Sequence, residues 1–156
     1  MAIFGNCVNG SGGEKDNLVP DTIGVQFDTY QHCRYYICMG LSVNFYKTND
    51  LHCPVTVFLD SLPGKTAQKV AWVLKLIEEI DVIPRKYFKK LAPYDIWEVR
   101  IDFSGNTYRI LSFLHNDSQL ILTHGFIKKT QKTPKNEINK ALSYKSEYLN
   151  NGGWNR

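Results

Sequence analysis

Three apolar-rich segments in close succession constrain the fold of this chain more than any other feature. They are DIWEVRIDF (residues 95–103), TYRILSFLH (107–115) and SQLILTHGFI (118–127). Each has the length and side-chain content of a β-strand, and only the short stretches SGN and NDS separate them. Short turns of this kind join neighbouring antiparallel strands. The sequence therefore predicts a three-stranded antiparallel meander.

The chain before the meander predicts one more strand and a helical hairpin. SVNFYK (42–47) alternates apolar and polar residues, as a strand does. Pro54 opens a short helix, LPGK breaks it, and a second helix is expected over residues 65–80. RKYFKKLAP (85–93) is interpreted as a basic, aromatic connector with at most one turn of helix.

A last helix is expected after the meander, with Thr133 as N-cap and Pro134 as its first residue. Its apolar stripe is predicted to contain Ile138, Ala141, Leu142, the stem of Lys145, Tyr148 and Leu149. The fold class is therefore α+β: a small antiparallel sheet packed by a helical hairpin and a C-terminal helix, in the order β-α-α-β-β-β-α.

The 156 residues allow one domain with a substantial core. Residues 1–40 contain the polar, turn-rich stretch GNCVNGSGGEKDN. We expect residues 1–40 to be an N-terminal extension, either disordered or produced by a mis-assigned start near Met39. Residues 41–150 are expected to form the functional domain, and residues 151–156 a C-terminal tail.

Composition narrows the class of protein. No apolar run of about 18 residues occurs, and the N-terminus lacks a basic leader followed by an apolar block, so we expect a cytoplasmic location. The four cysteines include no CxxC pair, so we expect no metal site. We also expect no cofactor.

Positive charge is concentrated late in the chain. The protein carries a net charge of +4, and HGFIKKTQKTPK (124–135) contains four lysines and no acidic residue. Clustered cations create the local potential to which a polyanion such as a nucleic acid responds.

Strand alternation adds a second group of charges. It places Trp97, Val99, Ile101 and Phe103 on a core face, and Glu98, Arg100 and Asp102 on the opposite face. On the next strand, Arg109 is expected on the face opposite to that of Tyr108 and Ile110. On the last strand, His124 and Lys128 are expected to share one face. We therefore expect a compact basic surface, drawn from three neighbouring strands, that contains the carboxylate of Glu98.

Each of these residues also has a structural explanation. Charges on one strand face are usual for a half-solvated sheet, and a run of lysines is often a solvated surface. An ion pair with Glu98 would account for Arg109 in an otherwise apolar strand. His124 would be a hydrogen-bonded structural histidine. The functional interpretation depends on these groups meeting at one place.

The strings IWEVRIDFSGNTYRILSFLH and HGFIKKTQKTPKNEINKAL resemble the RelE/HigB superfamily of toxins from type II toxin–antitoxin systems, and within it the phage-derived, host-inhibition (Gp49-like) branch. The resemblance covers about residues 41–149. It implies a RelE-like fold and a metal-independent endoribonuclease, an mRNA interferase that cuts messenger RNA in the ribosomal A site. It also implies a cognate antitoxin, expected to be of the helix-turn-helix type, that inhibits the toxin.

The resemblance also implies roles for individual residues. Arg109 would bind the scissile phosphate, Arg100 occupies a strand position that is basic in relatives, and Lys128 and Lys129 would stabilise developing charge. Arg109→Ala is then expected to abolish toxicity without unfolding the domain. Contacts to messenger or ribosomal RNA are expected from Lys132, Lys135, Arg85, Lys86, Lys89 and Lys90, with Lys140 and Lys145 as further docking lysines.

Two departures from the family pattern leave the general base open. No tyrosine follows the last basic cluster at the expected place, and Glu98 stands where relatives can carry lysine. Glu98 and His124 are the alternatives for the base, and either could instead orient its neighbours.

Two rival functions remain open. One is a toxin of the same fold that inhibits DNA gyrase by binding, and the other is a non-catalytic RNA- or protein-binding module. The presence of Glu98, Arg100, Arg109 and His124 together favours the nuclease.

Overall fold

The computed structural model of the chain describes residues 40–153. Apart from Gly40, the extension expected over residues 1–40 lies outside this range, as do the last residues of the tail. Among the residues described, no helix is both long and apolar enough to cross a bilayer.

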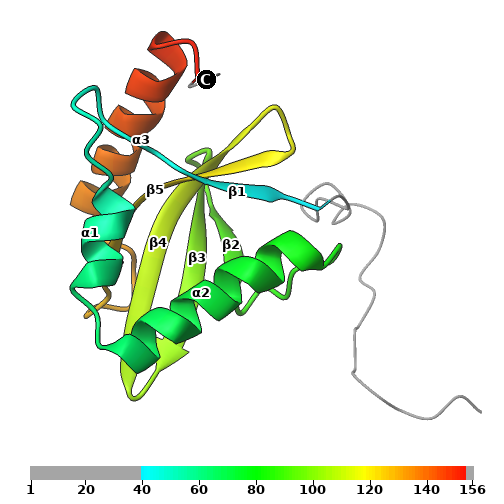
Figure 1. Ribbon diagram of the computed structural model, residues 1–156, viewed down its shortest axis with the longest axis vertical. Helices are drawn as coiled ribbons and strands as arrows, with labels where there is room; N and C mark the ends of the chain where they lie inside the picture. Colours follow the sequence, from blue (N-terminus) through cyan, green and yellow to red (C-terminus); the bar gives the residue numbers. More distant parts are fainter. Residues whose placement is uncertain (1–39, 154–156) are drawn as a thin grey trace, which may run out of the picture. The chain divides into compact units, whose positions relative to one another are not determined.

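The described chain forms five strands and three helices, so the α+β class is confirmed. Figure 1 shows the elements, which follow the chain as β1 (Ser42–Phe45), α1 (Pro54–Asp60), α2 (Gly64–Glu79), β2 (Phe88–Leu91), β3 (Ile96–Phe103), β4 (Asn106–His115), β5 (Gln119–Ile127) and α3 (Lys135–Asn150). Every predicted strand and helix is present, with ends shifted by no more than a residue or two.

Strand β2 was not predicted, because residues 85–93 were interpreted as a connector. It pairs antiparallel with β3, with Phe88 opposite Val99 and Leu91 opposite Ile96. The ring of Phe88 stacks on Trp97, with centroids 4.6 Å apart. A four-residue strand interrupted by two lysines has little intrinsic preference, so pairing with β3 and this stacking must stabilise it.

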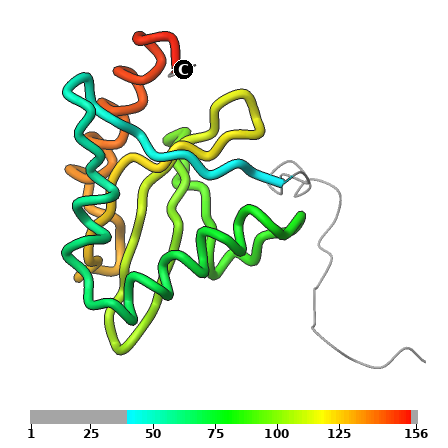
Figure 2. Tube along the Cα trace, viewed as in Figure 1, coloured from blue at the N-terminus to red at the C-terminus, as the bar shows by residue number. Residues whose placement is uncertain are grey.

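The sheet has the order β1-β5-β4-β3-β2. Strands β3, β4 and β5 form the predicted antiparallel meander. Strand β1 instead runs parallel to β5, with Ser42 opposite Gln119, and Figure 2 shows the two segments side by side. The sheet is therefore mixed, whereas the sequence was interpreted as giving a purely antiparallel one.

The helical hairpin and α3 cover opposite faces of the sheet. The buried residues of α2 (Val70, Val73, Leu74 and Ile77) pack with the predicted core face of β3. On the other face, Ala141 and Tyr148 of α3 pack with Leu111 and Phe113 of β4. In Figure 1, α2 crosses in front of the strands and part of α3 lies behind α1.

The C-terminal helix differs in detail from its prediction. Ile138, Ala141 and Tyr148 are buried as expected, but Leu149 is 49% exposed. The helix begins after Pro134, and the Thr133 hydroxyl does not cap it. That hydroxyl is bonded to Glu98 instead.

A β-bulge in β5 decides which side chains face α3. Leu111 of β4 lies opposite His124, whereas the next residue, Ser112, lies opposite Leu122, so Thr123 is an extra residue in the strand. Leu122 therefore packs toward the helical hairpin, while His124 and Phe126 face α3. The pairing of β4 with β5 continues on both sides of the bulge.

Candidate functional site

Three cationic side chains surround the carboxylate of Glu98 on the face of the sheet that α3 partly covers. Glu98 Oε1 lies 3.1 Å from Arg109 Nε, 3.4 Å from Arg100 Nε and 3.9 Å from Lys128 Nζ. The Thr133 hydroxyl donates a hydrogen bond to Oε2 of the same carboxylate. We call these five residues the Glu98 cluster.

The sheet register explains why the cluster forms. Arg100 of β3 and Arg109 of β4 lie directly opposite each other. The backbone amide of Lys128 donates to Thr107 O at 2.7 Å, which extends the β4–β5 pairing by one residue. Because of the bulge, Lys128 then falls on the same face as the two arginines. The predicted basic surface from three adjacent strands is therefore present.

Arg109 is the most enclosed cation of the cluster, with only 3% of its surface exposed. Its Nη1 donates to Asp102 Oδ1 at 3.0 Å and to the carbonyl oxygens of Tyr108 at 2.7 Å and Ile101 at 3.4 Å. Within residues 40–153, its Nη2 makes no hydrogen bond. The ion pair with Glu98 that would explain Arg109 structurally is therefore present.

The burial of Arg109 changes the expected effect of its substitution. Removing one partner of a buried ion pair typically destabilises a protein by about 3–5 kcal/mol. We therefore no longer expect Arg109→Ala to leave the domain folded, and this variant cannot separate activity from stability.

Arg100 and Lys128 are the cations that solvent reaches. The side chain of Arg100 is 30% exposed and that of Lys128 is 10% exposed. Burial lowers the pKa of Lys128 below lysine's ordinary value, and the charges of Arg109, Arg100 and Lys89 lower it further, while Glu98 acts in the opposite direction. The part of the cluster that solvent reaches thus contains one permanently charged guanidinium, from Arg100, and one ammonium group, from Lys128, that releases its proton more readily than usual.

His124 shares the face of the cluster but makes different contacts. It is 2% exposed; its Nε2 lies 2.8 Å from Glu137 Oε2 on α3, and its Nδ1 lies 3.2 Å from Thr123 Oγ1. Burial lowers the pKa of His124, and the bond to Glu137 only partly opposes this effect. The structure therefore places His124 in the packing of α3 against the sheet, as the structural explanation expects.

The exposed lysines of residues 129–135 do not pair with Glu98. Lys129, Lys132 and Lys135 are all exposed, and none forms an ion pair within the part of the chain that is described. Lys129 was grouped with Lys128 from the sequence, but the structure brings only Lys128 to Glu98.

The basic connector divides between the two faces of the sheet. Lys89 lies opposite Glu98 in the register of β2 and β3. Lys90 pairs with Asp95 at 3.1 Å, and Lys145 pairs with the same carboxylate at 2.7 Å. Arg85 and Lys86 are exposed before β2. The residues expected to bind RNA therefore do not form one continuous surface.

Sequence reasoning missed the role of Thr133. The pattern Thr-Pro before a helical stripe indicates an N-cap, and nothing local indicates that the hydroxyl bonds to a carboxylate on β3. Only the path of residues 128–134 across the end of the sheet reveals the contact.

Residues 57–145 match the protein family described as "Phage derived protein Gp49-like (DUF891)". This range contains every member of the Glu98 cluster. No curated protein matches the chain at a significant level.

Proposed function

Because the chain belongs to the phage-derived Gp49-like family, a branch of the RelE/HigB-like toxin superfamily, we propose that it is the toxin of a type II toxin–antitoxin system. The proposed activity is metal-independent cleavage of messenger RNA on the ribosome, in the cytoplasm. The proposed inhibitor is a cognate antitoxin with a helix-turn-helix domain. One observation carries the proposal: three cations from neighbouring strands meet at Glu98, and two of them reach solvent.

The proposed reaction is attack of an RNA 2′-hydroxyl on the adjacent phosphate. The new bond joins the 2′-oxygen to phosphorus while the bond to the 5′-oxygen breaks, which leaves a 2′,3′-cyclic phosphate and a 5′-hydroxyl. The protein must stabilise extra negative charge on the phosphate oxygens and supply a proton to the leaving 5′-oxygen. Both tasks suit the exposed edge of the Glu98 cluster.

Arg100 is proposed to bind the scissile phosphate. Its guanidinium stays charged and can donate two parallel hydrogen bonds to phosphate oxygens. Its side chain is 30% exposed, and its Nε lies 3.4 Å from Glu98 Oε1, which keeps the guanidinium at the edge of the cluster. A phosphate would meet Arg100 and Lys128 before it met the more deeply buried Arg109.

Lys128 is proposed to protonate the leaving oxygen. Its lowered pKa makes the ammonium group a stronger acid than an ordinary lysine, and the proton can be regained from solvent. In its charged form it also adds to the positive field that stabilises the phosphorane. The 2′-hydroxyl proton passes to solvent in this scheme.

Glu98 and Arg109 are proposed to position the other two groups. The Glu98 carboxylate lies beside three cations, and its Oε2 accepts a hydrogen bond from the Thr133 hydroxyl. Such a carboxylate is better suited to orient Arg100 and Lys128 than to abstract a proton. His124 is likewise engaged by Glu137 beneath α3. Of the two alternatives for the base, neither is free in this arrangement.

The exposed lysines are proposed to guide RNA to the cluster. Lys129, Lys132 and Lys135 lie just before or at the start of α3 and are exposed. Each phosphate that they neutralise should make binding weaker as salt concentration rises.

The proposal can be tested by inducing the protein without its antitoxin and mapping messenger 5′ ends by primer extension. We expect cuts only in translated messages. Arg100→Gln should reduce cutting about 10²–10³-fold, the usual cost of losing one charge-stabilising group. Lys75→Gln, on an exposed part of α2 paired only with Glu79, is the matched control and should cut normally.

The rival functions give different results. Growth arrest with intact transcripts and an induced DNA-damage response would reject the nuclease in favour of gyrase inhibition. Normal growth on expression of folded protein would reject a toxin of either kind. Cuts in untranslated transcripts would retain the nuclease but reject its dependence on the ribosome.

A further inference from the structure

A second cationic surface lies on the helical-hairpin side of the sheet, on the face opposite the Glu98 cluster. Its centre is Trp72 of α2, which is 47% exposed. The ammonium of Lys69 lies 3.8 Å from the centre of the Trp72 ring system, and the Tyr87 ring contacts Trp72 nearly perpendicularly at 5.8 Å. Lys86 Nζ lies 4.7 Å from the Tyr87 ring centre.

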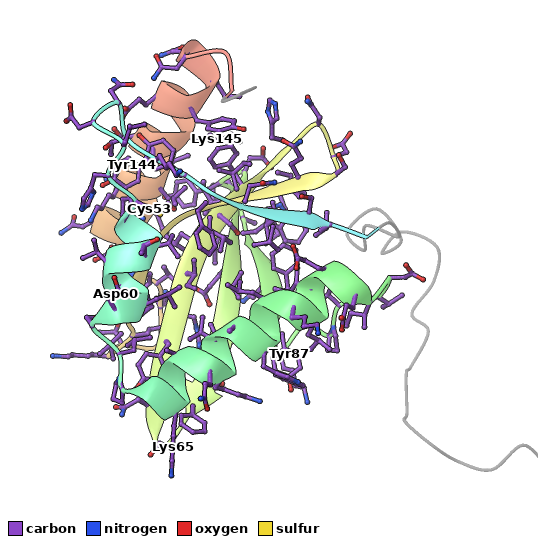
Figure 3. The ribbon with its side chains drawn as sticks, viewed as in Figure 1. Cys53, Asp60, Lys65, Tyr87, Tyr144 and Lys145 are labelled. Carbon is purple, nitrogen blue, oxygen red and sulfur yellow. The ribbon has the colours of Figure 1, made fainter. Side chains whose placement is uncertain are left out.

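Helical spacing aligns part of this surface. Lys65, Lys69 and Trp72 are four and then three residues apart on α2, so they share one side of the helix. The buried stripe of α2, which includes Val70 and Val73, faces the sheet instead. Lys65 and Tyr87 both project on the lower side of α2 in Figure 3.

The cations of this surface lack acidic partners. Lys65, Lys69 and Lys86 form no ion pair with any carboxylate in the described part of the chain. On the same helix, by contrast, Lys75 pairs with Glu79 at 3.5 Å. A large exposed indole with uncompensated cations around it has the chemistry to bind an anion that also carries a flat ring.

We propose that Lys65, Lys69, Trp72, Lys86 and Tyr87 form a binding surface for single-stranded RNA, which we call the Trp72 surface. One base stacks on the Trp72 indole, and the neighbouring phosphates contact the lysines. Aromatic rings beside a positively charged track are the features by which proteins bind single strands without reading their sequence.

The ammonium group already resting on Trp72 does not prevent stacking. A base stacked on an aromatic side chain binds more strongly than an exposed cation–π contact does. A base can therefore replace the Lys69 ammonium over the ring. The displaced ammonium is then free to pair with a phosphate of the same nucleotide.

RNA fits the Trp72 surface better than a protein partner does. A protein interface needs a large area with a fully buried centre. Here one exposed indole has the Lys69 ammonium over its ring and Lys86 over the neighbouring Tyr87 ring. That pattern complements a polyanion with regularly spaced rings, and this inference does not depend on the proposed cleavage reaction.

The test measures fluorescence anisotropy of a labelled ten-nucleotide 2′-O-methyl oligouridylate mixed with the whole protein. The probe lacks the 2′-hydroxyl, so binding is read without cleavage. We expect Trp72→Ala to weaken binding about 5- to 150-fold, the range corresponding to the loss of one stacked base. Lys69→Gln and Lys86→Gln should each weaken binding and lower the slope of log affinity against log salt by about 0.7.

Two controls isolate the Trp72 surface. Phe45→Ala removes another exposed aromatic ring, 41% exposed on β1, and should bind the probe like the unmodified protein. The same series in an Arg100→Gln background removes binding at the Glu98 cluster and should preserve the effect of Trp72→Ala. A circular dichroism melt of each variant confirms that the domain remains folded.

Equal affinity of Trp72→Ala and the unmodified protein would overturn the inference. Loss of affinity on lysine substitution alone would also overturn it, because it would show an electrostatic surface without base stacking. Failure of transcript cleavage would leave the binding result unaffected, so the two proposals can fail separately.

Discussion

Arg100 and Arg109 lie directly opposite each other on adjacent strands, and both Nε atoms are within 3.4 Å of one oxygen of Glu98. Like charges directly opposite in a sheet are destabilising. Here the carboxylate of Glu98 pairs with both guanidinium groups, which would otherwise repel each other, and Asp102 pairs with Arg109 as well. The Glu98 cluster therefore depends on this carboxylate for stability as well as for the direction of its cations.

Glu98→Gln should be strongly destabilising. It keeps the size of the side chain but removes the carboxylate that pairs with Arg100 and Lys128 and leaves Arg109 only its pair with the exposed Asp102, and the expected loss is about 3–5 kcal/mol in the free energy of unfolding. Urea denaturation checks this value. Asp95→Asn is the matched control: Asp95 also pairs with two lysines but is 63% exposed, so its loss should cost no more than about 1 kcal/mol. Similar losses for both variants would contradict the structural role of Glu98.

Cleavage should weaken at alkaline pH. The proposed proton donor is the charged form of Lys128, and its pKa is lowered from the ordinary 10.5 by burial and by neighbouring cations. The rate should therefore fall as pH rises through this lowered pKa. Lys128→Arg retains the charge, so the alkaline loss should move to higher pH even if the maximum rate drops. Cleavage rates measured across the pH range in a reconstituted translation reaction provide the test. If the unmodified protein and Lys128→Arg lose activity over the same alkaline pH range, Lys128 is excluded as the donor.

Acidification should destabilise the fold through His124. Its pKa is lowered from 6.5, mainly by burial. As the pH decreases, the unfolded chain therefore binds a proton at His124 before the folded chain does. Stability should therefore fall as pH decreases from 6.5 to the lower folded pKa. His124→Gln should remove this part of the pH dependence. His52→Gln, at an exposed loop position, is the control and should keep it. The free energy of unfolding, measured by urea titration at several pH values, distinguishes the two.

Gly125→Ala should disturb the contact between β5 and α1. A Cβ at this position would lie 2.1–2.6 Å from atoms of the Phe58 ring, including Cγ, which cannot move without shifting the side chain as a whole. Overpacking of this kind costs about 1–3 kcal/mol. Phe58→Leu should recover part of the loss in the double variant. Gly64→Ala is the control, because a Cβ there has no neighbour within 4 Å. Thermal melts of the unmodified protein, Gly125→Ala, Phe58→Leu and the double variant measure the coupling between the two positions.

The meander and both helical layers could be predicted from local patterns. Alternation in residues 95–103 assigned Trp97 and Val99 to one face and Glu98 and Arg100 to the other, as the structure confirms. Short turns fixed the order of β3, β4 and β5. These features depend on the period of the strand and on turn residues, which are local properties of the chain.

The missed features depend on partners distant in sequence. Strand β2 is stabilised by its pairing with β3. The Thr133 hydroxyl, which precedes α3, bonds to the Glu98 carboxylate on β3. The parallel pairing of β1 with β5 likewise leaves no local signal. For the candidate site, the sequence identified the charges, but it could not show that Arg109 would be buried or that Lys129 would be left outside the cluster.

The bulge at Thr123 makes the segment that follows it sensitive to changes in length, and the sensitivity is asymmetric. Deletion of one residue between His124 and Lys128 would move Lys129 into the place beside Glu98, so the same kind of charge would be restored. Insertion of one residue there would bring Ile127 to that place and set an apolar side chain against a carboxylate. The tandem lysine thus protects the cluster against shortening of the strand, but nothing equivalent protects it against lengthening.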